Sequence, residues 1–446
     1  MKVKTVKAMF ASVVAAAGLM AFAEGDLSIT LNRVQQRYPW NGMVDIDYTV
    51  AGVPEPANYF VRFTATTAAG VKYVAHEMLD ASTLINASNG TYRVTWVATA
   101  EGTVFQDCAE FFTKNAKYKA ELVYSSSDKS QIPYPYYTVI DVSDGPDATN
   151  YPVAYEYFAN THLATNKYNT AEYKTNKIVL RKIHACTFTM GSPEDEVGRE
   201  NVSSPNNNKE TQHVVTLTED YYVGMFPITQ MQWLKVVGGG NPATSGGDDA
   251  DICPVEGVSY RDIRGSTKGI NLSLLPNGSV DADSFLGKLR DKSGLTDLDL
   301  PSEAQWENAA RAGTTSSTYF GNNVTNNMSS AEIGKYVWHL GNSDNKTHGV
   351  GQVIPNQWGL YDTLGNVLEI CLDRVAAPPT DDWGADQVTD PLRAVSGRVV
   401  VRGGYFSGDA IRARSAARDS MPSASGSNYF RGFRLARRSP GAVLDE

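Results

Sequence analysis

The strongest constraint on the fold is a period of two in the apolar residues of the segment 26–143. Valine, isoleucine and tyrosine occupy every second position of the segment 44–50, and tyrosine, valine and tryptophan do so in the segment 92–96. Each run follows an Asn-Gly dipeptide, which favours tight hairpin turns. Short strands separated by turns, without a helical period, predict an all-β, immunoglobulin-like antiparallel sandwich over residues 24–145. Such a module typically serves as a spacer or a binding platform.

The first 23 residues have the pattern of a signal peptide. Lysines precede an apolar run from Met9 to Met20, and Ala21-Phe22-Ala23 offers the small residues that a cleavage site needs. The run is shorter than the roughly 20 apolar residues of a membrane-spanning helix. We therefore expect a mature chain that begins near Glu24, has no membrane span, and is secreted, periplasmic or held at the cell surface.

Composition narrows the function classes. The chain has 446 residues, and 40 lysines and arginines against 49 acids give a net charge of −9, which disfavours nucleic acid as a partner. A hydrophobic fraction of 42% excludes a globally disordered chain. Four cysteines are too few for a disulfide scaffold and too scattered for a zinc site, and their pairing is left open; they are Cys108, Cys186, Cys253 and Cys371.

The remainder of the chain is predicted to be a second domain of mixed α and β structure, with many irregular loops. The Asn- and Thr-rich segment 146–180 is interpreted as a linker, residues 181–438 as the domain, and 439–446 as a tail. Capping boxes predict helices that begin after Thr229 and after Ser302.

The second of these helices is expected to bury one face. Trp306, Ala309 and Ala310 have helical spacing, which predicts an apolar face toward the core. Glu307 and Arg311 are four residues apart and are expected to pair on the helix surface.

Several short motifs within residues 181–438 resemble those of a known family, and they occur in the same order. They are Thr187–Ser192, His213–Leu217, Phe226–Trp233, Pro254–Tyr260, Leu300–Arg311, Pro355–Glu369, and Arg402-Gly-Gly404 followed by Gly432-Phe-Arg434. Together they resemble the formylglycine-generating-enzyme, or sulfatase-modifying-factor, domain. The resemblance implies a C-type-lectin-like α+β fold, mostly irregular, and it does not extend to residues 24–150.

The resemblance also implies a chemistry, which is copper-dependent oxidation of a sulfatase cysteine by an enzyme with two cysteine ligands. The family places these ligands in the segment 405–418, which contains no cysteine here, and Leu368 stands where the family usually has tryptophan. The catalytic residues are therefore unknown. Other members use iron and histidines, but the six histidines of this chain show no closely spaced pair.

A calcium site is implied more directly. By resemblance the ligands are the side chains of Asp362 and Glu369 and the carbonyl groups of Gly365 and Val367. Two carboxylates and two carbonyls in one turn suit this cation, with water completing the shell. The alternative is a purely structural turn. The acidic run Glu194–Glu196 is interpreted as a solvated loop.

The arginine-rich C-terminal segment has two interpretations. In one, it lines a ligand cleft formed by Ser407, Asp409, Arg412, Arg414, Ser415 and Arg418. In the other, its arginines form ion pairs that brace the fold. The leading hypothesis is an exported, catalytically divergent module that binds a protein, peptide or glycan and holds calcium. The alternative is an oxidoreductase of the family that uses copper or iron, either on sulfatase cysteines or as a related nonheme metal enzyme.

Overall fold

The structure is a computed structural model, and it describes residues 27–36, 43–54, 59–66, 70, 72–79, 82–85, 87–97, 117–124, 136–158, 161–199, 210–246, 249–265, 280–321, 324, 330–375, 386–393, 397–421 and 425–438. The chain divides into two compact units. The first comprises residues 1–136 and 157–164, and the second comprises residues 137–156 and 165–446. The segment 1–26, which holds the predicted signal peptide, and the tail 439–446 lie outside the described residues.

In its described part, the first unit consists of β-strands, one short helix and the first part of a second helix, residues 161–164. The elements are β1 (Ser28–Gln36), β2 (Met43–Ala51), β3 (Tyr59–Thr66), β4 (Lys72–Val74), β5 (Met78–Leu79), α1 (Ser82–Ile85), β6 (Gly90–Val97) and β7 (Lys117–Tyr124). Among these residues one sheet has the order β1-β2-β6-β5 and another has the order β4-β3-β7, with all pairs antiparallel.

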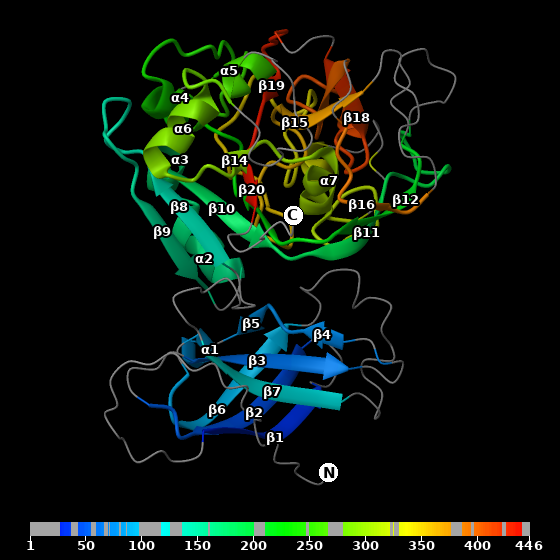
Figure 1. The fold of residues 1–446 in the computed structure, drawn as a ribbon. Coiled ribbons are helices and arrows are strands. Elements are labelled where there is room, and N and C mark those ends of the chain that lie inside the picture. Colours follow the sequence, from blue (N-terminus) through cyan, green and yellow to red (C-terminus); the bar gives the residue numbers. More distant parts are fainter. Residues whose placement is uncertain are drawn as a thin grey trace. The chain divides into compact units, whose positions relative to one another are not determined.

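The two sheets form two layers around one core (Figure 1). Buried and half-buried residues alternate along β2, as the period of two predicts. Tyr48 of β2 packs edge-on against Phe63 of β3, with ring centroids 5.3 Å apart. The dipeptide at 89–90 does not close a two-residue hairpin. Instead, the Asn89 amide binds both the N–H and the carbonyl of Val53.

The second unit contains short helices and many loops around several small sheets. Its elements are β8 (Tyr136–Asp141), β9 (Val153–Tyr157), α2 (Thr161–Tyr168), α3 (Ala171–Thr175), β10 (Lys177–Ile183), β11 (Cys186–Met190), β12 (His213–Leu217), β13 (Tyr221–Gly224), α4 (Gln230–Val237), η5 (Ala250–Ile252), α5 (Tyr260–Arg264), α6 (Phe285–Ser293), β14 (Leu298–Asp299), α7 (Glu303–Arg311), α8 (Ser330–Ile333), β15 (Leu368–Val375), β16 (Val388–Thr389), β17 (Arg398–Arg402), η7 (Ala410–Arg412), β18 (Arg418–Met421), β19 (Arg431–Gly432) and β20 (Ala436–Arg438). Three of these elements, β8, β9 and α2, contain residues of both units.

The division between the units differs from the one that the sequence suggests, since the first unit ends at residue 136 and also takes residues 157–164. Strand β8 pairs antiparallel with β10, so most of β8 belongs to the second unit. Within the described residues the largest sheet has the order β14-β20-β13-β10-β8-β9. The segment 146–180, predicted to be a linker, contains β9, α2, α3 and the start of β10. Its polar composition gives little sign of these elements, in which β9 lies beside β8, and β10 lies between β8 and β13.

The predicted helix starts agree with the structure. The Thr229 and Ser302 side chains each accept the backbone N–H three residues on, and Gln232 and Gln305 complete the two capping boxes. Trp306, Ala309 and Ala310 are buried, as predicted. The pairing of Glu307 with Arg311 on the helix surface is corrected. The two groups do pair, at 2.8 Å, but both are buried.

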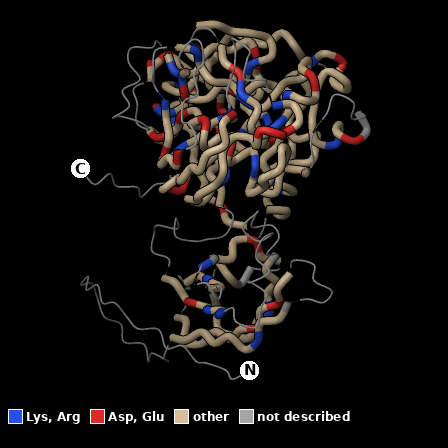
Figure 2. The backbone as a smooth tube through the Cα atoms, turned by 90° about the vertical axis from the view of Figure 1, so that its right-hand side faces the viewer, with Lys and Arg blue, Asp and Glu red and all other residues tan. Residues whose placement is uncertain are grey.

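A four-stranded sheet in this unit, with the order β18-β17-β15-β19 among the described strands, contains Arg402, Arg418 and Arg431. Lys and Arg positions are interspersed with Asp and Glu positions in this unit (Figure 2). No helix in the described part of the chain has the length and apolar content needed to cross a membrane.

Candidate functional site

The candidate site forms where β17 ends. Gly403 and Gly404 follow the strand with φ angles of 99° and 75°, a region that disfavours residues with side chains. A Cβ atom on Gly403 would lie 2.9 Å from the carbonyl oxygen of Thr363, so the backbones approach closely there. The chain can therefore reverse into the loop 405–409, η7 and β18.

A cavity of about 140 Å³ lies beside this reversal. Its lining residues are Gly198, Glu210, Leu368, Gly404, Tyr405, Asp409, Ile411, Arg412, Arg414, Ala417, Arg418 and Asp419. It therefore brings together four of the six residues predicted for a ligand cleft, namely Asp409, Arg412, Arg414 and Arg418. Ser407 and Ser415 are not among the lining residues, and the Ser415 side chain is buried.

Arg414, which lines the cavity, is held in buried ion pairs. Its Nη1 donates to Glu196 Oε1 at 2.6 Å and to Glu210 Oε2 at 2.8 Å, and its Nη2 donates to Glu210 Oε1 at 2.8 Å. Burial raises the pKa of Glu196, and attraction to Arg414 opposes that shift. Glu194 and Asp195 are exposed, as predicted, whereas Glu196 is buried, which corrects the interpretation for that residue alone.

Further ion pairs involve Arg418 and two acids of α7, Glu303 and Glu307. Arg418 Nε and Nη2 donate to the two oxygens of Glu303 at 2.5 and 2.7 Å. The buried Arg402 forms an ion pair with Glu307, which also pairs with Arg311. Burial raises the pKa of Glu307, but the two guanidinium groups outweigh it and hold that pKa below its usual value. Arg414 and Arg418 therefore fit the interpretation in which the C-terminal arginines form ion pairs that brace the fold.

The exposed rim of the cavity is different. Arg412 and Asp409 are exposed, while Tyr405 and Asp419 are half-buried. The Tyr405 ring stacks on Phe430 with centroids 4.5 Å apart. Leu368 is a buried lining residue, at the position where the family usually has tryptophan. The rim can thus offer hydrogen-bond donors, carboxylate acceptors and a flat aromatic face.

Sequence reasoning missed part of this site. Glu210, Gly198 and Asp419 line the cavity, and Glu196 supports it from below. Glu196 and Arg414 are separated by 218 positions, and Glu210 and Arg414 by 204. No local sequence pattern could have paired residues that are so far apart. The acidic run 194–196 and the arginine-rich C-terminal segment gave only a weak signal, because their charges are opposite.

The described cysteines do not fit a copper site in this cavity. Cys371 and Cys253 are buried, Cys186 is half-buried, and none of the three lines the cavity, while Cys108 lies outside the described residues. Burial raises the pKa of the Cys371 thiol well above its usual value and that of Cys186 to about 11, whereas a ligand must be a thiolate. In the described part of the chain, no cluster of three or more His, Cys, Asp and Glu side chains is arranged to hold a metal ion.

The four predicted calcium ligands lie in one turn before and at the start of β15. Asp362 is buried and its Oδ2 accepts the N–H of Gly351 at 2.7 Å. Burial raises the pKa of Asp362 to about 6. Burial also lowers the pKa of Lys174, with attraction to Asp362 opposing that change.

Glu369 does not fit this ligand set. Its Oε1 accepts from Arg434 Nη2 at 2.5 Å, and its Oε2 accepts from Arg434 Nε and Trp306 Nε1, both at 2.6 Å. A carboxylate whose two oxygens face a buried guanidinium group is already neutralised. Calcium binding by this turn stays a prediction.

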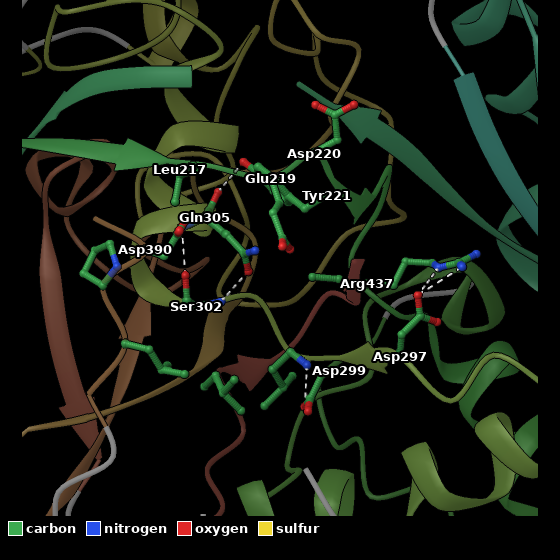
Figure 3. Close-up of a pocket in the computed structure, with 15 residues that line it drawn as sticks. Leu217, Glu219, Asp220, Tyr221, Asp297, Asp299, Ser302, Gln305, Asp390 and Arg437 are labelled. Carbon is green, nitrogen blue, oxygen red and sulfur yellow. Dashed lines mark hydrogen bonds and ion pairs between the residues drawn. The ribbon is translucent and has the colours of Figure 1, made fainter. Parts of the chain in front are cut away.

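A larger cavity, of about 260 Å³, lies elsewhere in the second unit (Figure 3). Its polar groups are largely engaged with one another. Arg437 pairs with Asp297, while Ser302 and Gln305 form the α7 capping box. The buried Asp299 pairs with two arginines outside the lining. The smaller cavity is the stronger candidate, since its lining holds four of the residues predicted for a ligand cleft.

Comparison with known proteins identifies a family and several similar proteins. A sequence profile described as the sulfatase-modifying factor enzyme 1-like domain matches residues 165–439. Chaperone protein LppX of Paenibacillus barcinonensis is 31% identical over 192 residues, which cover 38% of this chain and 67% of that protein. Formylglycine-generating enzyme of Thermomonospora curvata is 35% identical over 118 residues, which cover 24% of this chain and only 38% of that protein.

Among solved structures, PvdO from Pseudomonas aeruginosa is 25% identical, covers 58% of this chain and 94% of its own, and has a TM-score of 0.45. The family profile covers more than half of the chain. This chain therefore belongs to the family of the sulfatase-modifying factor enzyme 1-like domain.

Proposed function

We propose that this protein is a ligand- or partner-binding member of its family that does not carry out formylglycine formation. The observation that carries the proposal is the lining of the smaller cavity, where charged and aromatic side chains stand and, among the described residues, no cysteine or histidine does. Copper-dependent oxidation needs thiolate ligands, whereas recognition needs only donors, acceptors and shape.

The rim residues have distinct roles in the proposed binding. Arg412 offers a planar fork of N–H donors suited to a carboxylate, Asp409 offers acceptors, and Tyr405 offers a ring face for stacking. Arg414 and Arg418 form a preformed floor, because their ion pairs are complete without a ligand. A preformed site lowers the conformational entropy lost on binding. The relative described as a chaperone protein agrees with partner binding.

We further propose that the first unit is an immunoglobulin-like domain that carries the binding domain on an exported protein. The strand orders β1-β2-β6-β5 and β4-β3-β7 support this, because they match the A-B-E-D and C′-C-F orders of that fold. Mass measurement of the protein expressed with its first 23 residues tests export. A mature chain that starts at Glu24 is expected, and retention of Met1 in the exported fraction would contradict it.

The binding proposal is tested with peptide and glycan arrays. Wild type, Arg412→Glu and Asp409→Arg are compared with Arg261→Glu, a control that reverses an exposed arginine of α5 outside the cavity lining. We expect the array signal of wild type and of the control to agree, and the signal of both rim variants to fall. Equal signals in all four proteins would place binding elsewhere.

The oxidoreductase alternative is tested separately. Wild type is supplied with copper, or with iron, together with oxygen and a cysteine peptide of the kind found in sulfatases. We expect the peptide mass to remain unchanged. Conversion of its cysteine to formylglycine would refute the proposal and require ligands other than the described cysteines.

A further inference from the structure

The turn predicted to bind calcium is contacted by a cation of the chain itself. Arg434 lies between β19 and β20 and is 1% exposed, as is Glu369. Its Nη2 donates to the carbonyl of Tyr361 at 2.9 Å and to Glu369 Oε1 at 2.5 Å. The Arg434 guanidinium group thus links Tyr361, which precedes Asp362, to Glu369, the last of the predicted ligands.

Arg434 is also bound to a third element. Its Nη1 donates to the carbonyl of Gly224, at the end of β13, at 2.8 Å. Its Nε donates to Glu369 Oε2 at 2.6 Å. Of the four predicted calcium ligands Arg434 contacts Glu369, while the carbonyls that it binds belong to Tyr361 and Gly224. Its planar guanidinium group thus takes both oxygens of a carboxylate that a calcium ion would need.

The turn also supports the candidate cavity. Asn366 accepts the N–H of Phe406, in the loop that carries Tyr405, and Leu368 is itself a lining residue. The turn therefore helps to position two parts of the cavity lining, Leu368 and the loop of Tyr405. In a calcium-dependent domain, a chelator would disassemble such a cavity.

We propose that Arg434 replaces calcium as the cation that holds the turn 361–369, so that the binding cavity is assembled without calcium. The inference rests on the proposed function only in naming the cavity as the binding site. Its test uses thermal stability without any ligand, so a failure of this inference is distinguishable from a failure of the binding proposal.

The first measurement compares the melting temperature of the wild-type chain in calcium and in chelator. We expect the two values to agree. A melting temperature that falls in chelator would overturn the inference, because it would show that a bound divalent cation contributes to folding.

The second measurement uses Glu369→Gln, which retains the size and acceptor of the side chain but removes its charge. If Arg434 is the partner, the variant melts below wild type by the same amount in calcium and in chelator. If calcium were the partner, the variant and wild type would coincide in chelator and differ only in calcium. That result would refute the inference.

Arg434→Met provides the reciprocal test, with the double variant Arg434→Met/Glu369→Gln as its control. The single variant leaves Glu369 buried without a cation, and the double variant removes the uncompensated charge. We expect the double variant to melt above Arg434→Met. A double variant that melts at or below the single variant would show that Arg434 and Glu369 are not energetically coupled.

Discussion

Replacing Arg414 with methionine tests whether its buried ion pairs hold the second unit together. Every N–H direction of this guanidinium group is used, since it also donates to the carbonyls of Ile411 and Gly198 in addition to its two glutamates. Methionine retains much of the stem but leaves Glu196 and Glu210 buried without their cation. Breaking a buried ion pair from one side costs about 3–5 kcal/mol, and we expect a loss of that size.

Urea denaturation followed by tryptophan fluorescence measures this loss, with free energies obtained by linear extrapolation. Arg412→Met is the matched control, because Arg412 lies two positions earlier and is exposed. Its expected effect is within about 0.5 kcal/mol of wild type. The triple variant Arg414→Met/Glu196→Gln/Glu210→Gln should recover part of the loss, since it buries no uncompensated charge. An effect of Arg414→Met no larger than that of Arg412→Met would refute the reasoning.

Three further predictions follow from the same unit. Burial, reinforced by repulsion from Glu303, raises the pKa of Asp373 from 3.8 to about 7. The folded state therefore binds this proton more tightly than the unfolded chain, so stability should fall as the pH rises from about 4 to about 7. In the Asp373→Asn variant, the urea midpoint should fall less over this pH range than it does in wild type. Parallel profiles of midpoint against pH in the two proteins would contradict the assignment. Ser302→Ala removes the N-cap of α7 and should cost about 1 kcal/mol in the same assay, whereas an unchanged midpoint would count against the cap. Cys371 is 0% exposed and should resist alkylation until urea unfolds the protein; labelling of the native chain, located by peptide mass, would show that its burial is wrong.

Local patterns were sufficient where the interactions are local. The period of two along β2 needs only the alternation of side chains across a strand, and the capping boxes of α4 and α7 need only groups three residues apart. The family resemblance likewise depends on short strings and their order, and the matching profile over residues 165–439 confirms it. These features were therefore readable before any tertiary contact was known.

Local patterns failed where burial decided the role of a charge. Glu307 and Arg311 have the spacing of a surface pair, yet α7 turns them inward because Arg402 and the backbone of Gly191 complete their bonding there. The linker interpretation of residues 146–180 failed for a related reason. The segment is polar, but its β9 and β10 strands join a sheet with β8 and β13, which lie outside the segment.

The C-terminal arginines show the same limit at the site itself. In the sequence, Arg412, Arg414 and Arg418 are similar members of one segment, and both a cleft and an ion-pair network were open to them. Tertiary structure separates them, because Glu210 and Glu303 approach from distant elements and bury Arg414 and Arg418, while Arg412 stays exposed. Whether a charged side chain braces the fold or faces a ligand depends on its long-range partners and on solvent access. Neither property is encoded in the spacing of residues along the chain.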